Sequence, residues 1–142
     1  MRTANDILLY KGTIVRSVRP DDSVLHALGV MAEYDIGAVI VLEGDSLVGI
    51  LTERDYARRV VLVGRSSRDS AISEVMTSKV ISVPPEQTID ECLALMTDKR
   101  VRHLPVVEDG RVFGLVSIGD LVRARIAEQE QVIEQLQHYI AG

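Results

Sequence analysis

Residues 49–55 read GILTERD and residues 114–120 read GLVSIGD, and each heptapeptide lies at the same place within a longer repeat. When residues 14–61 are aligned with residues 79–126 at an offset of 65, no gap is needed and 11 of the 48 positions are identical. Ordinary composition would give roughly three identities. A repeat this regular predicts two equal units related by a pseudo-twofold axis, with any ligand held near that axis.

Both copies carry the same order of predicted elements, β-α-β-β-α, which makes the fold class α+β. Short β-branched runs and acidic glycine-containing turns mark the strands, at residues 14–18, 38–42 and 47–51 and again at 80–83, 104–107 and 112–116. Ser23 and Thr88 are the expected N-caps of the first helix in each copy, and Thr52 and Ser117 precede the second.

The spacing of these elements predicts a first repeat at residues 5–65, a second at 71–127 and a C-terminal helix extension at 128–142. This last helix is expected from about residue 120 to 141, and isoleucines recur along it every seven residues, at Ile126, Ile133 and Ile140. Two heptads are too few to indicate a coiled coil, but the stripe needs cover, either from its own module or from a second chain.

The composition argues against several classes of partner. The 142 residues are 46% apolar with a net charge of −5, an acidic balance that disfavours nucleic acid as a partner. Cys92, the single cysteine, lies on a predicted buried helix stripe, and no Cys/His spacing indicates a metal site. With no signal peptide and no membrane-spanning run, we expect a cytoplasmic protein without a membrane partner.

The two heptapeptides allow two interpretations. In the first, Thr52 and Asp55 form a helix capping box, as Ser117 and Asp120 would in the second copy. In the second, the helix start and its hydroxyl suit a phosphate, while the aspartate accepts hydrogen bonds from vicinal ribose hydroxyls. The pattern alone favours the capping box; its duplication at corresponding places favours a paired nucleotide site.

The repeat as a whole resembles a tandem pair of cystathionine-β-synthase (CBS) domains, also called a Bateman module. The resemblance covers about residues 5–127 and is carried by GILTERD, GLVSIGD, RVRHLPVV and VISVPPEQTIDECLALM. It implies a regulatory module, not an enzyme, that binds AMP, ADP or ATP, with NAD and S-adenosylmethionine as further candidates, in clefts between the repeats. It also implies a homodimer, a disk of four repeats, that acts on an unidentified effector.

The resemblance assigns roles by position. Asp55 and Asp120 would hold ribose hydroxyls, and Thr52 and Ser117 would contact ribose or phosphate. The remaining implied contacts are Arg54, Arg102 and His103 for phosphate, Val15 and Val80 for adenine, and Pro105 beside the basic pair. Gly119 replaces Arg54, and Gly37 and Ala38 replace Arg102 and His103, so the two sites should differ.

Structural roles for the same residues stay open. The alternative for His103 is a surface histidine beside a strand, and the alternative for Arg102 is neutralisation of the acidic turns. Arg58 and Arg123 are most simply explained by solvated helix faces, and Lys11 by an exposed surface. The alternative function is a nucleic-acid-associated module, or a purely structural oligomerisation module without a small-molecule ligand.

Overall fold

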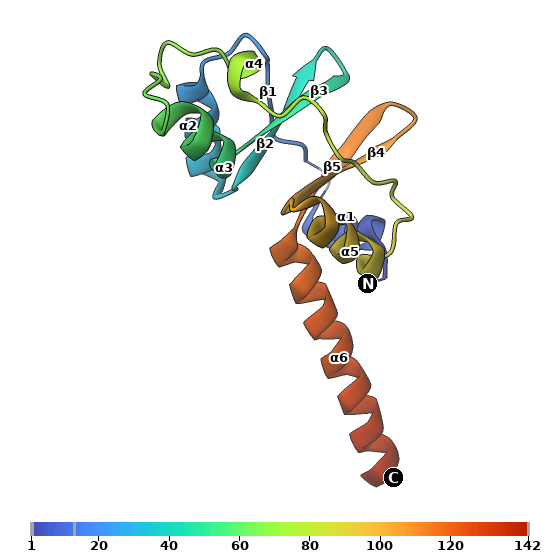
Figure 1. Cartoon of the computed structure of the whole chain (residues 1–142). Helices are drawn as coiled ribbons and strands as arrows, with labels where there is room; N and C mark the ends of the chain where they lie inside the picture. Colours follow the sequence, from blue (N-terminus) through green and yellow to red (C-terminus); the bar gives the residue numbers. More distant parts are fainter. Residues whose placement is uncertain (1, 13, 142) are drawn as a thin grey trace. The chain divides into compact units, whose positions relative to one another are not determined.

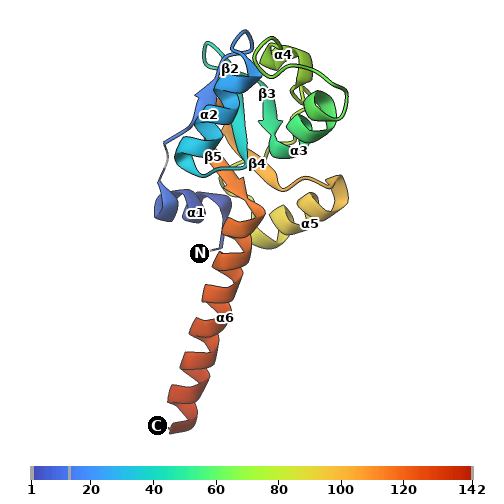
Figure 2. The same ribbon diagram turned by 90° about the vertical axis from the view of Figure 1, so that its left-hand side faces the viewer.

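The computed structural model of the chain describes residues 2–12 and 14–141, and its elements make an α+β protein with a long C-terminal helix (Figures 1 and 2). In chain order the elements are α1 (Ala4–Lys11), β1 (Ser17–Val18), α2 (Val24–Tyr34), β2 (Ala38–Glu43), β3 (Ser46–Thr52), α3 (Glu53–Tyr56), the π-helix η1 (Ala57–Val61), α4 (Ile72–Val75), α5 (Ile89–Lys99), β4 (His103–Glu108), β5 (Arg111–Ser117) and α6 (Ile118–Ala141). None of the described helices combines the length and apolar character needed to cross a bilayer.

The described residues form two compact units. The first-repeat unit holds residues 14–81 together with 108–112, and the second-repeat unit holds the described residues of 1–13, 82–107 and 113–142. Helix α1 therefore belongs with the second repeat although it precedes the first in the chain. The repeat boundaries at residues 5–65, 71–127 and 128–142 follow chain order and stay a prediction.

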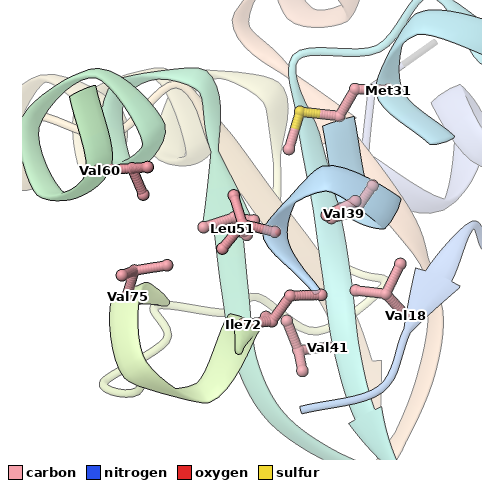
Figure 3. Close-up of a cluster of buried hydrophobic side chains, with 10 residues drawn as sticks. Val18, Met31, Val39, Val41, Leu51, Val60, Ile72 and Val75 are labelled. Atoms are coloured by element: carbon pink, nitrogen blue, oxygen red, sulfur yellow. The ribbon is translucent and has the colours of Figure 1, made fainter. Parts of the chain in front are cut away.

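The first-repeat unit is built on a three-stranded sheet in the order β1-β2-β3. Strand β1 pairs parallel to β2, and β2 pairs antiparallel to β3 with an irregularity between Val41 and Leu42. Only Ser17 and Val18 of the predicted strand at residues 14–18 enter the ladder. The sheet packs against α2, η1 and α4 through a cluster of buried side chains (Figure 3): Val18, Val24, Ala27, Met31, Val39, Val41, Leu51, Val60, Ile72 and Val75.

In the second-repeat unit, β4 and β5 form a two-stranded sheet, and the strand predicted at residues 80–83 is wrong except for one bridge. Val83 pairs parallel to Val106, with its N–H donating to the Pro105 carbonyl at 3.0 Å and its carbonyl accepting from Val107 at 2.8 Å. The next ladder bond would need an N–H at Pro105, which proline lacks. Ile40 occupies the aligned position of the first repeat and keeps its N–H, so that ladder continues.

The duplication extends to the helix ends. Helices α2 and α5 end at Asp35 and Arg100, 65 residues apart, and both residues adopt a left-handed conformation, with φ of 51° and 56°. The predicted caps Ser23 and Thr88 are confirmed, since each side-chain oxygen accepts from the backbone three residues later. Cys92 is fully buried on α5, and burial raises the pKa of its thiol to about 11.

The closing helix of the first repeat differs from the prediction of one helix over residues 55–63. It consists of the four residues of α3 followed by the π-helix η1. In the second repeat the same position starts α6, which continues as α-helix for 24 residues. Because a π-helix has more residues per turn than an α-helix, the side chain that lies one turn after Asp55 is a different one from that expected in an α-helix.

Helix α1 was not expected from the sequence, although Thr3 and Asp6 have the spacing of a capping box. The box forms: the Thr3 side chain accepts from Asp6 N–H, and the Asp6 carboxylate accepts from Thr3 N–H. The helix is held to the second-repeat unit by backbone hydrogen bonds from Ala4 to Gln87 and from Ile89 to Arg2. Its inner face buries Ala4, Ile7 and Leu8.

Gly114 of β5 allows this packing. A Cβ added there would lie 2.5 Å from a methyl carbon of Leu8, which is closer than carbon atoms approach. We expect Gly114→Ala to lower the free energy of unfolding by about 1–3 kcal/mol, because Leu8 must move in a packed interior. Urea denaturation measures this change, and Gly29→Ala, where an added Cβ has open space, is the control. Equal stability losses in both variants would contradict the packing of α1 on β5.

Candidate functional site

Each repeat presents a helix start at the tip of a strand, and the two starts have the same backbone arrangement. The Glu53 N–H donates to the Gly37 carbonyl at 3.0 Å, and the Ile118 N–H donates to the Arg102 carbonyl at 2.9 Å. The donors are 65 residues apart, and so are the acceptors. The residue before β2 or β4 thus holds the first helical residue after β3 or β5.

Asp55 closes a capping box in the first repeat. Its Oδ2 accepts from the Thr52 N–H at 3.0 Å, and its own N–H donates to Thr52 Oγ1 at 3.1 Å. The residue is 8% exposed, one of the few polar residues in the described core. The capping interpretation is therefore correct for this residue as a local description.

The Asp55 carboxylate also accepts hydrogen bonds from the segment after α4. The Thr77 hydroxyl donates to Oδ1 at 3.1 Å and lies 3.3 Å from Oδ2. Arg59 Nε lies 4.0 Å from Oδ1, at the edge of an ion pair. Thr77 is itself fixed to β3, since its backbone exchanges two hydrogen bonds of 2.9 Å with Ile50.

Asp120 has the same capping role in the second repeat but a more cationic setting. Its Oδ2 accepts from the Ser117 N–H at 2.9 Å, while its N–H donates to the Ser117 hydroxyl at 3.2 Å. Lys11 Nζ also donates to Oδ2, at 2.8 Å, and to the Leu115 carbonyl at 3.0 Å. Arg123 donates to Oδ1 at 2.9 Å. The two equivalent aspartates therefore differ in the charge of their partners.

The donors to the two aspartates come from corresponding segments. Lys11 aligns with Met76 at the offset of 65, and Gly12 aligns with Thr77. Asp55 is thus contacted by the segment that precedes the second repeat, and Asp120 by the segment that precedes the first. Lys11, which the sequence suggested as a plain surface lysine, is instead an ion-pair partner of Asp120.

Arg123 is exposed, as its predicted solvated helix face requires, but it also pairs with Asp120. The identity of Arg58 and Arg123 in the two copies was the available signal for this contact. In the first repeat Arg58 does not make the corresponding contact; the arginine near Asp55 is Arg59. The π-helical turn explains the shift of one residue.

The surroundings shift the pKa values of Asp120 and His103. Partial burial acts to raise the pKa of Asp120, but hydrogen bonds from Lys11 and Ser117 and the charge of Lys11 outweigh it, and the pKa is lowered. Burial lowers the pKa of His103, against the opposing charge of Asp120 and with support from Lys11 and Arg102. The imidazole is therefore neutral at neutral pH, beside an ionised carboxylate.

Acid should weaken this arrangement. The pKa of Asp120 is lower in the folded state than in the unfolded chain, where it is about 3.9. Ionised Asp120 therefore contributes its full stabilisation above the unfolded pKa, and this stabilisation is lost as pH falls through the folded pKa. We expect the urea midpoint to fall below about pH 4, and less steeply in Lys11→Met, where the pKa of Asp120 moves back toward its ordinary value. Lys79→Met is the matched control. Identical pH profiles for Lys11→Met and the parent would contradict the coupling.

The structure places the other predicted site residues as follows. Thr52 and Ser117 cap their helices and are partly buried. Arg54 lies exposed on α3, Arg102 lies exposed just before β4, and Val15 and Val80 are partly buried in extended segments outside the strands. His103 begins β4, and Pro105 is buried within it. The structure brings Asp55 together with Thr52, and Asp120 together with Ser117. The charge of Asp120 acts to raise the pKa of His103, but burial lowers it by more.

The two helix starts have fewer free backbone N–H groups for binding an anion than the sequence suggested. In each copy the first and third N–H groups are taken, by Gly37 and Thr52 in α3 and by Arg102 and Ser117 in α6. What each site offers a ligand is a carboxylate, a capping hydroxyl and, in the second repeat, a cluster of cationic groups. Such a set suits a sugar diol with a phosphate attached.

Comparison with known proteins supports the resemblance. The model of the CBS domain matches residues 12–62 and 72–127. CBSX3, a mitochondrial CBS domain-containing protein of Arabidopsis thaliana, is 42% identical over 149 residues, which cover 99% of this chain and 72% of that protein. The solved structure of a protein with CBS domains from Burkholderia ambifaria is 50% identical, with a TM-score of 0.85 over 89% of this chain and 96% of that chain.

A more distant neighbour was solved with ligands. The CBS domain pair of protein MJ0100, in complex with 5′-methylthioadenosine and S-adenosyl-L-methionine, is 25% identical, with a TM-score of 0.76 over 86% of this chain and 98% of that chain. Proteins with paired CBS domains are regulatory modules. On the sequence, the fold and these matches, the chain belongs to the CBS-domain family.

Proposed function

We propose that the chain is a regulatory module that binds an adenosine-containing ligand and is not an enzyme. The candidates are AMP, ADP and ATP, followed by NAD and S-adenosylmethionine. The observation that carries the proposal is the pair of equivalent carboxylates, Asp55 and Asp120, each 11% exposed in its side chain at a helix start. The ligand of the MJ0100 pair is of the same chemical class and supports it.

The contacts favour Asp55 as the stronger ribose site. Thr77, a neutral donor to its Oδ1, can rotate its hydroxyl away and leave that oxygen to a ribose hydroxyl. At Asp120 both oxygens already accept from cations, and an incoming sugar must displace Arg123 or Lys11. A phosphate at Asp120 would offset this loss, because Lys11 and Arg123 could pair with it.

The second candidate is a structural module in which the carboxylates serve their helices alone. The observation in its favour is that Thr3–Asp6 and Thr88–Glu91 form the same capping box without any proposed ligand. The two candidates make opposite predictions for ligand binding, so one experiment separates them. A role on nucleic acid would require binding that persists at physiological salt despite the acidic balance.

The test is a thermal-denaturation series with AMP, ATP, NAD and S-adenosylmethionine. At a ligand concentration of 100 Kd the stability gain should be about 2.7 kcal/mol, which raises the melting temperature measurably. Guanosine compounds of equal charge control for nonspecific anion effects. No shift with any adenosine compound at millimolar concentration would favour the structural module. A homodimer and a cytoplasmic location remain expectations from the family resemblance and the sequence.

A further inference from the structure

Helix α6 carries along most of its length an apolar stripe that the described residues do not cover. We call this stripe the α6 seam; it consists of Val122, Ile126, Gln129, Ile133, Leu136 and Ile140. Its members are spaced alternately by four and three residues, the spacing of positions d and a in a heptad. Five of the six are apolar, and these five are between 43% and 83% exposed.

The seam does not face the unit from which α6 emerges. Leu121 and Ala124 are the buried residues of the helix and pack it onto its own unit. Val122 follows Leu121 by one residue, which rotates it by about 100° around the helix axis. Ile126 is on the same side as Val122 and is 49% exposed, although it lies beside the packed part of the helix. The fold that buries Leu121 therefore leaves the seam open.

The helix also continues beyond the helices that it packs against, α5 and α1. Every described residue from 129 to 141 is exposed, and Figure 1 shows this part of α6 clear of α1 and α5. Isolated helices shorter than about 12–15 residues are marginal in water, and this segment needs packing to be stable. The packing has to come through the seam, because that is where its apolar side chains lie.

We propose that the α6 seam pairs with the α6 seam of a second copy of this chain, in a parallel two-stranded coiled coil. Ile126, Ile133 and Ile140 occupy the a positions, and β-branched residues at a with leucine at d favour two parallel strands. Leu136 is at d. In the parallel arrangement each residue meets its own copy, so the amide of Gln129 pairs with an amide.

Charge also selects the parallel orientation. Arg125 is at position g and Glu130 at the following e position, and in a parallel pair Arg125 faces Glu130 of the second copy. In its own chain Arg125 already pairs with Asp90 and Glu128, and Glu130 of the second copy would join this network. A fully overlapped antiparallel pair would place Gln129 against Ile133 of the second copy and bring the two Glu130 side chains together, and both contacts are unfavourable.

This pairing deepens the proposed function by joining two ligand-binding modules at their C-terminal helices. It does not depend on any nucleotide, and its failure would leave the ligand-binding proposal untouched. Conversely, a chain that binds no adenosine compound could still pair through α6.

The test is disulfide formation in the full chain under a glutathione redox buffer, with Leu136→Cys against Gln135→Cys. The d-position thiols meet in a parallel pair, whereas position 135 points outward, so Leu136→Cys should form covalent dimer much faster. Adding Ile133→Lys should abolish the fast cross-link, and adding Gln131→Lys, with the same charge on the outer face, should not. The parent chain, whose single thiol, Cys92, is buried, should form no covalent dimer.

Three outcomes would overturn the proposal. Equal rates for Leu136→Cys and Gln135→Cys would show that the seam does not pair. Fast cross-linking between Ile126→Cys and Leu136→Cys chains, without cross-linking of Leu136→Cys to itself, would show an antiparallel pair. A Leu136→Cys thiol that is protected from reagents in a monomer would show that the seam folds back on its own chain. Sedimentation at several protein concentrations identifies the monomer.

Discussion

Asp55→Asn is expected to weaken binding of the preferred adenosine ligand at the first repeat by about 10- to 150-fold, since hydrogen bonds to a charged group contribute about 1.5–3 kcal/mol. The physical reason is the loss of the charged acceptor for the ribose hydroxyls. Asparagine keeps the shape and can still accept from the Thr52 N–H, so the cap should survive. Isothermal titration calorimetry measures the change directly.

Asp6→Asn is the matched control because Thr3 and Asp6 form the same kind of capping box at the start of α1. Thr3 and Asp6 exchange the same two hydrogen bonds as Thr52 and Asp55, at the start of a helix with no proposed ligand role. Both variants should lose similar, small amounts of stability, and binding should weaken in Asp55→Asn alone. If the two variants bind the ligand equally well, Asp55 is a capping residue and nothing more.

The sugar itself offers a complementary check on the same carboxylate. A ligand lacking the 2′- and 3′-hydroxyls should bind the parent chain about as weakly as the complete ligand binds Asp55→Asn. With this analogue, the further change to asparagine should cost little, since the hydroxyl partners are already absent. A full additional loss would mean that Asp55 acts on some other part of the ligand.

Leu51→Ala is expected to lower the free energy of unfolding by about 2–5 kcal/mol, a large share of the 5–15 kcal/mol typical of native proteins. Leu51 is fully buried in the centre of the first-repeat core and directly precedes Thr52 (Figure 3). Its truncation leaves a cavity between β3, η1 and α4, so the helix start should also lose its support. Urea denaturation followed by circular dichroism measures the loss.

Leu62→Ala provides the comparison within the same unit. Leu62 is 77% exposed, and its truncation should change stability by no more than about 0.5 kcal/mol. Similar losses in Leu51→Ala and Leu62→Ala would contradict the core assignment. A Leu51→Ala chain that remains folded should also bind its ligand less tightly, because Thr52 follows Leu51 at the end of β3 and caps the helix that carries Asp55.

The local pattern of the sequence was sufficient for most of the fold. Apolar periodicity and capping residues predicted α2, α5 and the strand pairs, with Ser23 and Thr88 confirmed as caps. The spacing of Thr52 to Asp55 and of Ser117 to Asp120 also predicted the capping boxes that form. These features depend on residues within one or two helical turns of each other, and a sequence displays such neighbours directly.

Three other elements of the fold differ from the sequence prediction. The strand predicted at residues 80–83 fails because its partner strand contains Pro105, a residue far along the chain. The helix predicted at residues 55–63 changes to a π-helix at Ala57. The capping box at Thr3 gave a signal for α1, but the short apolar stretch after it carried no strong helical periodicity.

The sequence by itself determined the duplicated α+β repeat, its helix starts and the positions of the two motif aspartates, because these follow from local spacing and from the offset of 65. Tertiary structure alone decided which distant side chain contacts each aspartate. Lys11 reaches Asp120 across 109 residues, and Thr77 reaches Asp55 across 22. The charge difference between the two sites thus arises from long-range packing of the segments before each repeat, and residues that meet only through packing leave no periodic trace in the chain.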